Sequence, residues 1–351
     1  MDVKLDWAGL RIAMTLEQVA RRASVSPATV SRVLNNKAVV SSAARGRVMK
    51  AIEELKYSPN SHARALAAGS SRSIGVIVSN LEDPFFMDIY KAVEAGAGSA
   101  GFDIIMANTG YSPERLTASV RSMIGQRVAG LAAIVSEMDP RLIAELNERR
   151  IPTVFYDVGA PDRNIANIRV DYRSGMEMLI AYLYSLGHRR VGFVGHHATL
   201  GLISERQRVM LDAVGGYSDL HVETAADEDT LEGGLRAART LLAANPTITA
   251  MICANDLVAL GALLELRSRG LRVPHDISVT GFDDIKLAQF SDPPLTSVHI
   301  SREEIGRIIC DCLIGPTALL GREYVIDPEL VVRDSTGPAA VQSEWTANPE
   351  L

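Results

Sequence analysis

Two runs of sequence decide the fold of the N-terminal part of the chain: Thr15-Leu16-Glu17-Gln18-Val19-Ala20 and Val25-Ser26-Pro27-Ala28-Thr29-Val30-Ser31-Arg32-Val33-Leu34-Asn35. In the first run, Thr15 and Gln18 stand three residues apart, as in a capping box, where each side chain accepts from the backbone N–H of the other. This pair predicts a helix that begins at about Leu16. Leu16, Val19 and Ala20 would face inward, because they share one side of that helix.

The second run predicts a second short helix. Ser26 can cap it, and Pro27 then stands at the first helical position, where a missing N–H costs nothing. Val25 and Val30 flank the cap as a hydrophobic staple. The face left outward carries small, polar or basic side chains: Ala28, Thr29, Ser31, Arg32 and Asn35. Two such helices are typical of a helix-turn-helix that reads the DNA major groove, and the alternative is a solvated helix pair from another small helical domain.

Two more helices are expected next. Ser41 can cap a helix over about 42–55. Ser58 followed by Pro59 predicts a helix of about two turns. Because a helix this short is marginal alone, we expect it to form when it docks on DNA and on the same helix of a second copy.

Residues 14–67 resemble the lactose/galactose-repressor family of bacterial transcription regulators, and the resemblance continues to Arg333-Asp334-Ser335-Thr336. It implies a small all-α helix-turn-helix head joined to a two-lobed α/β body like that of periplasmic binding proteins. It further implies a ligand-responsive, sequence-specific repressor of a carbohydrate or related small-metabolite pathway. Such a protein binds a near-palindromic operator as a dimer and changes its affinity when a small molecule closes the lobes. The ligand either releases the DNA or is required for binding.

The charge distribution agrees with this expectation. Residues 14–72 contain ten Lys or Arg and three acidic residues, a net charge of +7. The whole chain carries −6 and residues 1–13 balance, so 73–351 carries −13. A basic head on an acidic body confines phosphate binding to one end, and binding should fall steeply with salt.

The resemblance implies DNA-binding roles in the head and the short helix. Arg32 would read a guanine through two hydrogen bonds. Pro27 and Ala28 would set operator choice by shape and methyl contact. Leu66 would wedge into the minor groove and kink a flexible step. The residues expected to hold phosphates are Thr15, Ser26, Ser31, Asn35, Tyr57 and Asn60. Leu16, Thr29 and Ala63 complete the DNA-binding set.

The rest of the chain alternates short apolar runs with amphipathic helices. With 351 residues, 47% of them hydrophobic, the chain can bury a large core. Expected strands are 74–78, 104–107, 130–135, 153–156 and 168–170 in one series, and 191–194, 250–253 and 278–281 in a second. Expected helices include 87–100, 114–126 and 257–269. This alternation predicts parallel sheets with right-handed crossovers, and the two series suggest two lobes.

These patterns and the resemblance give the expected boundaries. They are an N-terminal extension (1–13), a DNA-binding domain (14–57), a hinge helix and linker (58–72), an effector-binding and dimerisation domain (73–336) and a disordered tail (337–351). The N-lobe would comprise about 73–171 and 297–325, and the C-lobe about 172–296 and 326–336. The chain would cross between lobes near 171–174, near 295–301 and past 320.

Polar residues at the ends of the expected strands are candidates for the effector site, because ligands of such folds lie beyond the carboxyl ends of strands. Asn255 and Asp283 each end a strand. Arg206 matches the family's ligand-clamping arginine, with Arg208 as the alternative register. Donors and acceptors of this kind suit a polyhydroxyl ligand, since an unpaired buried polar group is expensive. The full effector-binding set is Phe85, Phe86, Ser136, Asp157, Arg206, Asn255 and Asp283.

Several of these positions leave alternatives open. Phe86 either covers a ring of the ligand or belongs to the lobe core. Val209 replaces the glycine usual in the family three residues after the clamp arginine. Asp229 stands where an aromatic often stacks on the ligand, which permits a more polar or cationic effector. His62, where the family usually has a small apolar residue, either makes hinge packing sensitive to pH or is a half-exposed neutral ring.

Other classes of protein are disfavoured. Neither the phosphate loop G-x-x-x-x-G-K-[ST] nor the nucleophile elbow G-x-S-x-G is present, so we expect no enzyme. Cys253, Cys310 and Cys312 form no disulfide pattern and indicate reduced thiols. His196-His197 lacks an evident set of metal partners. No membrane helix or secretory signal is expected, so we predict a cytoplasmic protein without cofactor or metal. Its partners would be double-stranded operator DNA, a sugar, sugar derivative or other polar metabolite, and a second copy.

Overall fold

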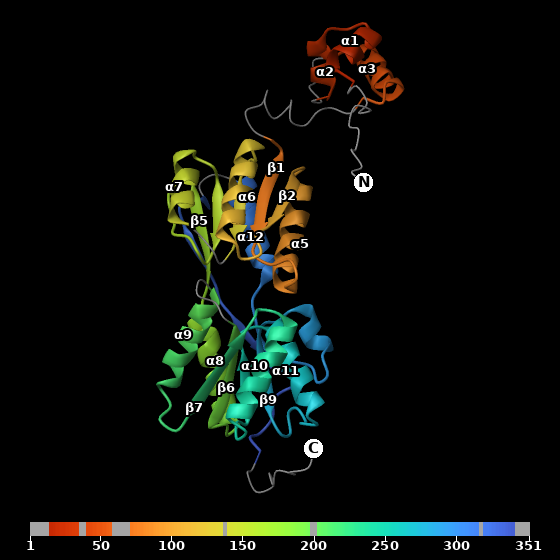
Figure 1. Cartoon of the computed structure of the whole chain (residues 1–351). Coiled ribbons are helices and arrows are strands. Elements are labelled where there is room, and N and C mark those ends of the chain that lie inside the picture. Colours follow the sequence, from red (N-terminus) through yellow and green to blue (C-terminus); the bar gives the residue numbers. More distant parts are fainter. Residues whose placement is uncertain are drawn as a thin grey trace, which may run out of the picture. The chain divides into compact units, whose positions relative to one another are not determined.

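Figure 1 shows a computed structural model of the chain, which describes residues 14–34, 40–57, 71–135, 139–196, 202–315 and 319–340. The chain divides between Ser71 and Arg72 into two compact units, a small helical head and a larger α/β body. The helix expected after Ser58, including His62, lies outside the described residues. So do five expected site residues: Asn35, Asn60, Ala63, Leu66 and Ser136.

The head contains α1 (Leu16–Ala23), α2 (Pro27–Leu34) and α3 (Ser42–Glu54). The capping box is present: the Thr15 N–H donates to Gln18 Oε1 at 2.7 Å, and the Gln18 N–H donates to Thr15 Oγ1 at 3.3 Å. Ser26 Oγ accepts from the Thr29 N–H at 3.2 Å, and Ser41 caps α3 in the same way. The predicted starts of all three helices are confirmed.

One apolar core joins the three helices. Its fully buried members include Val19 from α1, Val30 from α2 and Val48 from α3. Val25 packs against this core, to which Val30 belongs, as the staple predicts. The core fixes α2 against its neighbours and leaves the opposite face of α2 to solvent.

The described body contains a six-stranded sheet in each lobe. The N-lobe order is β11-β5-β4-β3-β1-β2, and the C-lobe order is β12-β10-β9-β8-β6-β7. All neighbours run parallel except the edge strand β12, which is antiparallel to β10. The N-lobe strands are β1 (Ser73–Val78), β2 (Asp103–Asn108), β3 (Leu131–Ile134), β4 (Thr153–Tyr156), β5 (Ile165–Val170) and β11 (Glu323–Ile326). The C-lobe strands are β6 (Arg190–His196), β7 (His221–Asp227), β8 (Ala250–Cys253), β9 (Ser278–Asp283), β10 (Thr296–His299) and β12 (Glu329–Val331).

Every expected strand coincides with an observed one, but four observed strands were not predicted. β7 is an edge strand with no buried residue, so it lacks the apolar run that signals a buried strand. β11 and β12 are short edge strands of mixed exposure. β10 is buried but has only four residues, beginning shortly after Pro293-Pro294.

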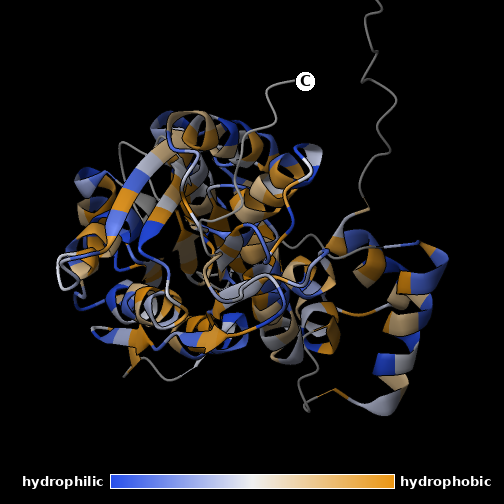
Figure 2. Ribbon diagram, turned by 90° about the horizontal axis from the view of Figure 1, so that it is seen from below, coloured by the Kyte–Doolittle hydropathy of each residue, from blue (hydrophilic) through white to orange (hydrophobic). Residues whose placement is uncertain are grey.

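Helices pack on the sheets. Those of the N-lobe are α5 (Pro84–Ser99), α6 (Pro113–Gly125), α7 (Pro140–Glu148) and α12 (Arg302–Ile314). Those of the C-lobe are α8 (Tyr172–Ser185), α9 (Leu202–Val214), α10 (Leu231–Ala244) and α11 (Asp256–Ser268), with the short 3₁₀ helix η2 (Lys286–Phe290). Asp83, Ser112 and Asp139 each cap a helix that has proline in its first turn. A capping side chain followed by proline is a strong local signal for the start of a helix. Figure 2 shows hydrophilic and hydrophobic residues alternating along these helices, as in amphipathic helices.

The chain passes between the lobes three times: from β5 to α8, from β10 to α12 and from β11 to β12. The expected boundary at 297 lies inside β10, which pairs with β9 in the C-lobe sheet. The N-lobe therefore resumes at α12. The expected boundary at 325–326 falls at the end of β11, since Ile326 still pairs with Val170.

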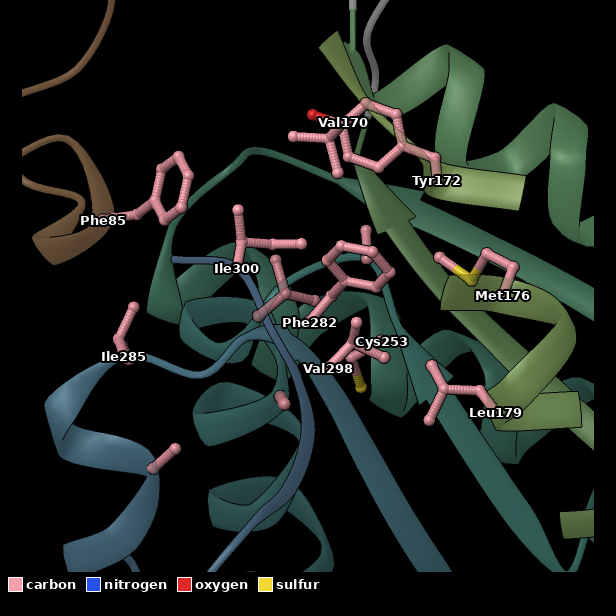
Figure 3. Packing of buried hydrophobic residues seen from close by; sticks show 14 of the residues in the cluster. Phe85, Val170, Tyr172, Met176, Leu179, Cys253, Phe282, Ile285, Val298 and Ile300 are labelled. Atoms are coloured by element: carbon pink, nitrogen blue, oxygen red, sulfur yellow. The ribbon is translucent and has the colours of Figure 1, made fainter. Parts of the chain in front are cut away.

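One apolar cluster runs through both lobes near the crossings. It includes Phe85 of α5, Phe282 of β9 and Ile300 between β10 and α12, which Figure 3 shows with their neighbours. Continuous packing of this kind transmits a displacement from one lobe to the other, because packed cores deform little.

The start of the expected disordered tail is ordered. His188 Nε2 lies 3.1 Å from the Gly337 carbonyl, and the Gly337 N–H donates to Ser278 Oγ at 3.1 Å. The Ala339 N–H donates to the Leu186 carbonyl at 2.9 Å. Backbone hydrogen bonds to the C-lobe therefore hold 337–339, and the prediction was wrong for these residues.

Candidate functional site

The outward surface of α2 carries the side chains expected to meet DNA. Pro27, Ala28 and Arg32 are exposed, and so is Ser26 at the cap. Thr29 and Ser31 are half-buried, and the hydroxyl groups of Ser26 and Thr29 lie 3.0 Å apart. Thr15 is exposed, whereas Leu16 and Tyr57 are half-buried. The structure thus brings a basic side chain and small side chains to one exposed helix face, which suits entry into a major groove.

In the body, Arg206 of α9 and Asp283 at the end of β9 form a buried ion pair. Arg206 Nη2 donates to Asp283 Oδ1 at 2.6 Å and Arg206 Nη1 donates to Asp283 Oδ2 at 3.2 Å. Arg206 is 4% exposed and Asp283 2%. Arg206 Nη1 also donates to the Ala254 carbonyl at 2.8 Å. Arg208 is exposed and pairs with Glu205 and Asp212, so the structure places Arg206 rather than the alternative Arg208 beside Asp283.

Aromatic rings surround this ion pair. The Arg206 guanidinium lies 4.5 Å from the ring centroid of Phe282 and 4.9 Å from that of Tyr172. A cation over ring faces is attracted by the ring quadrupole, more strongly where water is excluded.

Asn255 links the C-lobe to the N-lobe through Asp229. Its Oδ1 caps α11 by accepting from the Val258 N–H at 2.9 Å, and its Nδ2 donates to Asp229 Oδ1 at 2.8 Å. The other carboxylate oxygen of Asp229 accepts from the Tyr111 hydroxyl at 2.8 Å. Tyr111 follows β2 in the N-lobe, so Asp229 receives donors from both lobes.

Asp83, the cap of α5, adds a carboxyl group from the N-lobe. It accepts from the Phe85 N–H at 2.9 Å and is 5% exposed. Burial, together with the negative charges of Asp283 and Asp229, raises the pKa of Asp83 to about 7. We call Asp83, Tyr111, Arg206, Asp229, Asn255 and Asp283 the inter-lobe site.

Asp157 follows β4 and lies at the first crossing. Its carboxylate accepts from the Val170 N–H at 2.9 Å and from the Tyr172 hydroxyl at 2.7 Å. Burial raises the pKa of Asp157 to about 7 although both hydrogen bonds oppose the rise. Asp157 also lines a cavity of about 460 Å³ with residues of both lobes, including Tyr172 and Arg208. It is the one expected effector residue, among those described, that lines this cavity.

Phe85 and Phe86 lie in the apolar cluster, 2% and 6% exposed. The Phe85 ring packs 5.8 Å from that of Phe86 and 6.0 Å from that of Tyr156, between centroids. In this structure Phe86 therefore belongs to the lobe core, rather than to a surface that would cover a ring of the ligand.

Four residues that lie close to the expected effector residues were not in the predicted set: Asp83, Tyr111, Tyr172 and Phe282. The N-cap pattern of Asp83 before Pro84 could have found one of them. Tyr111 had no such signal, since its partner Asp229 lies 118 residues away. Among the described residues, no group of three or more His, Cys, Asp or Glu could hold a metal ion. Within the same residues, no helix is long and apolar enough to cross a membrane.

Comparisons with known proteins agree with this arrangement. Residues 15–60 match the family model described as bacterial regulatory proteins, lacI family, and residues 180–336 match that of the periplasmic binding protein-like domain. The chain is 32% identical to the HTH-type transcriptional repressor CytR of Escherichia coli (strain K12), over 92% of this chain and 96% of that protein.

Solved structures match over the same length. One is a LacI-family transcriptional regulator from Silicibacter pomeroyi, with a TM-score of 0.82 and 26% identity over 92% of this chain and 99% of that chain. Another is the lac repressor dimer bound to operator and the anti-inducer ONPF, with a TM-score of 0.80 and 28% identity over the same shares. The helix-turn-helix head, the two-lobed body and these matches together show that the chain belongs to the lacI family of bacterial regulatory proteins and is a DNA-binding transcriptional regulator.

Proposed function

We propose that the chain is a repressor that binds a near-palindromic operator as a dimer, and that a small polar effector binding at the inter-lobe site changes its affinity for DNA. The observation that carries the proposal is the meeting of both lobes at Asp229, beside the buried pair of Arg206 and Asp283. A ligand that exchanges hydrogen bonds with these groups would favour one lobe angle over another. Such a preference is what a ligand needs to shift an equilibrium.

The chemistry of the site favours a ligand with several hydroxyl or amide groups. Arg206 Nε is buried and, among the described residues, lacks a hydrogen-bond partner, so a ligand oxygen could accept from it. Asn255 and Tyr111 donate to Asp229 in this structure, and both could donate to a ligand instead. Unmet buried donors cost free energy, which makes such a site selective for ligands that satisfy them.

For DNA, we propose the roles already given to the head, with Arg32 reading a base and the surrounding hydroxyl groups holding phosphates. The proposed head is 14–57, followed by the hinge helix and linker 58–72, where Asn60, Ala63 and Leu66 would contact DNA. The proposed effector set in the body is that predicted, without Phe85 and Phe86, which lie in the apolar cluster, and extended by Asp83, Tyr111 and Asp229.

The dimer needs a surface, and the C-lobe offers one. Leu264 on α11 and Leu287 and Phe290 on η2 are 46%, 50% and 71% exposed. Arg267 of α11 lies 3.9 Å from Asp292, just beyond η2, which brings the two segments together. We propose that a second copy covers this apolar face, since a soluble monomer seldom leaves such side chains together in water.

The relatives are regulators rather than enzymes, and we propose that the site binds its ligand without converting it. Native mass spectrometry of the protein, incubated with the fraction below about 1 kDa of an extract of the source cells, tests the site. The protein should retain a polar compound unchanged, and Asn255→Ser, which keeps the helix cap but loses the amide, should not. Asn245→Ser, at the far end of α10 from Asp229, is the control. Equal retention by Asn255→Ser would remove Asn255 from the site.

A further inference from the structure

The turn that presents Asp283 has an unusual backbone. Asp283 and Asp284 have φ values of 97° and 52°, so two consecutive residues with side chains occupy the left-handed region. Residues other than glycine rarely adopt it, because the Cβ atom crowds the backbone, and they persist there only where neighbouring groups hold them. The geometry of the ion pair with Arg206 therefore depends on what holds this turn.

A single side chain holds the carbonyl groups of the turn. Arg302 Nη1 donates to the carbonyls of Asp283 and Ile300, the latter at 2.7 Å, and Arg302 Nη2 donates to the Asp284 carbonyl at 2.9 Å. Arg302 is 8% exposed. Both Nη atoms of Arg302 thus donate to backbone carbonyl groups, whereas its buried Nε has no hydrogen-bond partner among the described residues. Within the same residues, Arg302 makes no ion pair.

Arg302 starts α12, which packs on α5 in the N-lobe, whereas Asp283 ends a strand of the C-lobe. One side chain therefore ties the first turn of an N-lobe helix to the turn that carries an effector residue. The fixed fork of a guanidinium can reach several carbonyls at once, which the single nitrogen of lysine cannot do in the same geometry.

The side chain of Asp284 is held from other segments. His299 Nδ1 lies 3.1 Å from Asp284 Oδ2, and Arg333 Nη2 lies 2.7 Å from Asp284 Oδ1. The Asp284 N–H donates to Ser297 Oγ at 3.1 Å. These partners come from β10 and from the chain after β12, both in the C-lobe. Among the hydrogen bonds and ion pairs of the described residues, those of Arg302 connect the turn to an N-lobe helix.

We propose that Arg302 is a positioning residue that holds the Asp283–Asp284 turn for effector binding and passes a displacement of Asp283 to α12. The proposal rests on the proposed function, because it assigns a role to Arg302 in the response to effector. Arg302 itself would not touch the effector. Burial raises the pKa of the Asp283 carboxyl group, and the positive charges of Arg206 and, to a smaller extent, Arg302 oppose this rise.

The test measures operator affinity of the full-length protein with and without the fraction below about 1 kDa of a source-cell extract. We expect this fraction to shift the operator Kd of the wild type roughly ten-fold, within the usual range of allosteric coupling. Arg302→Met should keep operator affinity in the absence of extract and reduce the shift to less than about two-fold. Arg302→Lys, which keeps the charge and some donors, should recover part of the shift. Arg307→Met is the matched control, because Arg307 lies on the exposed side of α12 and pairs only with Glu304 and Asp311 among the described residues.

Each result decides between the two proposals. No shift in the wild type would overturn the proposed function and the role of Arg302 with it. A full shift in Arg302→Met would overturn the role of Arg302 alone. If both Arg302 variants lose thermal stability, operator binding and the shift in parallel, Arg302 is structural and the proposal fails. Loss of the shift with operator affinity retained, partly rescued by lysine, would support it.

Discussion

Arg206 and Asp283 share two hydrogen bonds although they lie 77 residues apart, and each is almost wholly buried. A buried ion pair offsets its desolvation only when both partners are present. Removal of either partner therefore leaves an uncompensated buried charge, which destabilises the body as well as changing the site. The response to effector and the stability of the C-lobe must be measured together.

We expect Asp283→Ala to destabilise the body by about 3–5 kcal/mol, because it leaves the Arg206 guanidinium buried without its carboxylate. The double variant Arg206→Leu with Asp283→Ala should lose less than the sum of the two single changes. Denaturant unfolding measures both quantities. Arg208→Ala, which removes an exposed arginine of the same helix, is the control and should change stability by no more than about 0.5 kcal/mol. Strict additivity would show that the two side chains are not coupled.

Asp83 should make stability fall as pH rises. Its pKa is about 7 in the folded protein against an ordinary value of 3.8, so between these values the folded state retains a proton that the unfolded state has lost. Unfolding then releases a proton, and stability decreases with pH through this window. Asp83→Asn keeps the helix cap but cannot ionise. Its Tm relative to wild type should increase from pH 4 to pH 8, and a difference independent of pH would contradict the assignment.

Tyr111→Phe should favour open lobes. The change deletes the hydroxyl that joins the N-lobe to Asp229, a loss of about 1 kcal/mol, or roughly five-fold in the ratio of closed to open forms. Spin labels at Arg121 of α6 and Ala243 of α10 would report the separation of the lobes. Tyr184→Phe deletes a Tyr–Asp hydrogen bond inside the C-lobe and should leave the distances unchanged. The same distances in Tyr111→Phe as in wild type would mean that this bond does not hold the lobes.

Local signals in the sequence predicted much of the fold. The capping box of Thr15 and Gln18 and the cap at Ser26 act over three residues, so the sequence alone specifies them. Arg206, Asn255 and Asp283 followed from the family resemblance, and the structure brings Arg206 onto Asp283. Tyr111 and Arg302 could not be predicted, because their partners are carbonyl groups or carboxylates brought near by the tertiary fold. The polar edge strand β7 was missed for a related reason: pairing with β6, rather than burial of its own side chains, makes it a strand.

Arg32→Ala should reduce the preference of the protein for its operator over other DNA by about 1–3 kcal/mol, since it removes a contact that reads a base. Equilibrium binding to operator and to scrambled duplex at several salt concentrations measures this preference. Arg22→Ala is the control, because Arg22 pairs with Glu54 on the neighbouring helix. A uniform loss on both duplexes would make Arg32 a phosphate contact instead.

Phe290→Asp should weaken the dimer by placing a charge in the apolar face of η2, and sedimentation velocity would show a monomer at low micromolar concentration. Val332→Asp introduces the same charge at another exposed apolar position, 53% exposed, and should leave the dimer intact. A dimer in both variants would place the interface elsewhere.

The most direct test of the account is selection of bound fragments from the source genome by the purified full-length chain, at about physiological ionic strength, with and without the small-molecule extract. We predict enrichment of a near-palindrome with a flexible central step, and a change in its recovery when the extract is present. Fragments no more enriched than random DNA under either condition would contradict the assignment of the head as a sequence reader.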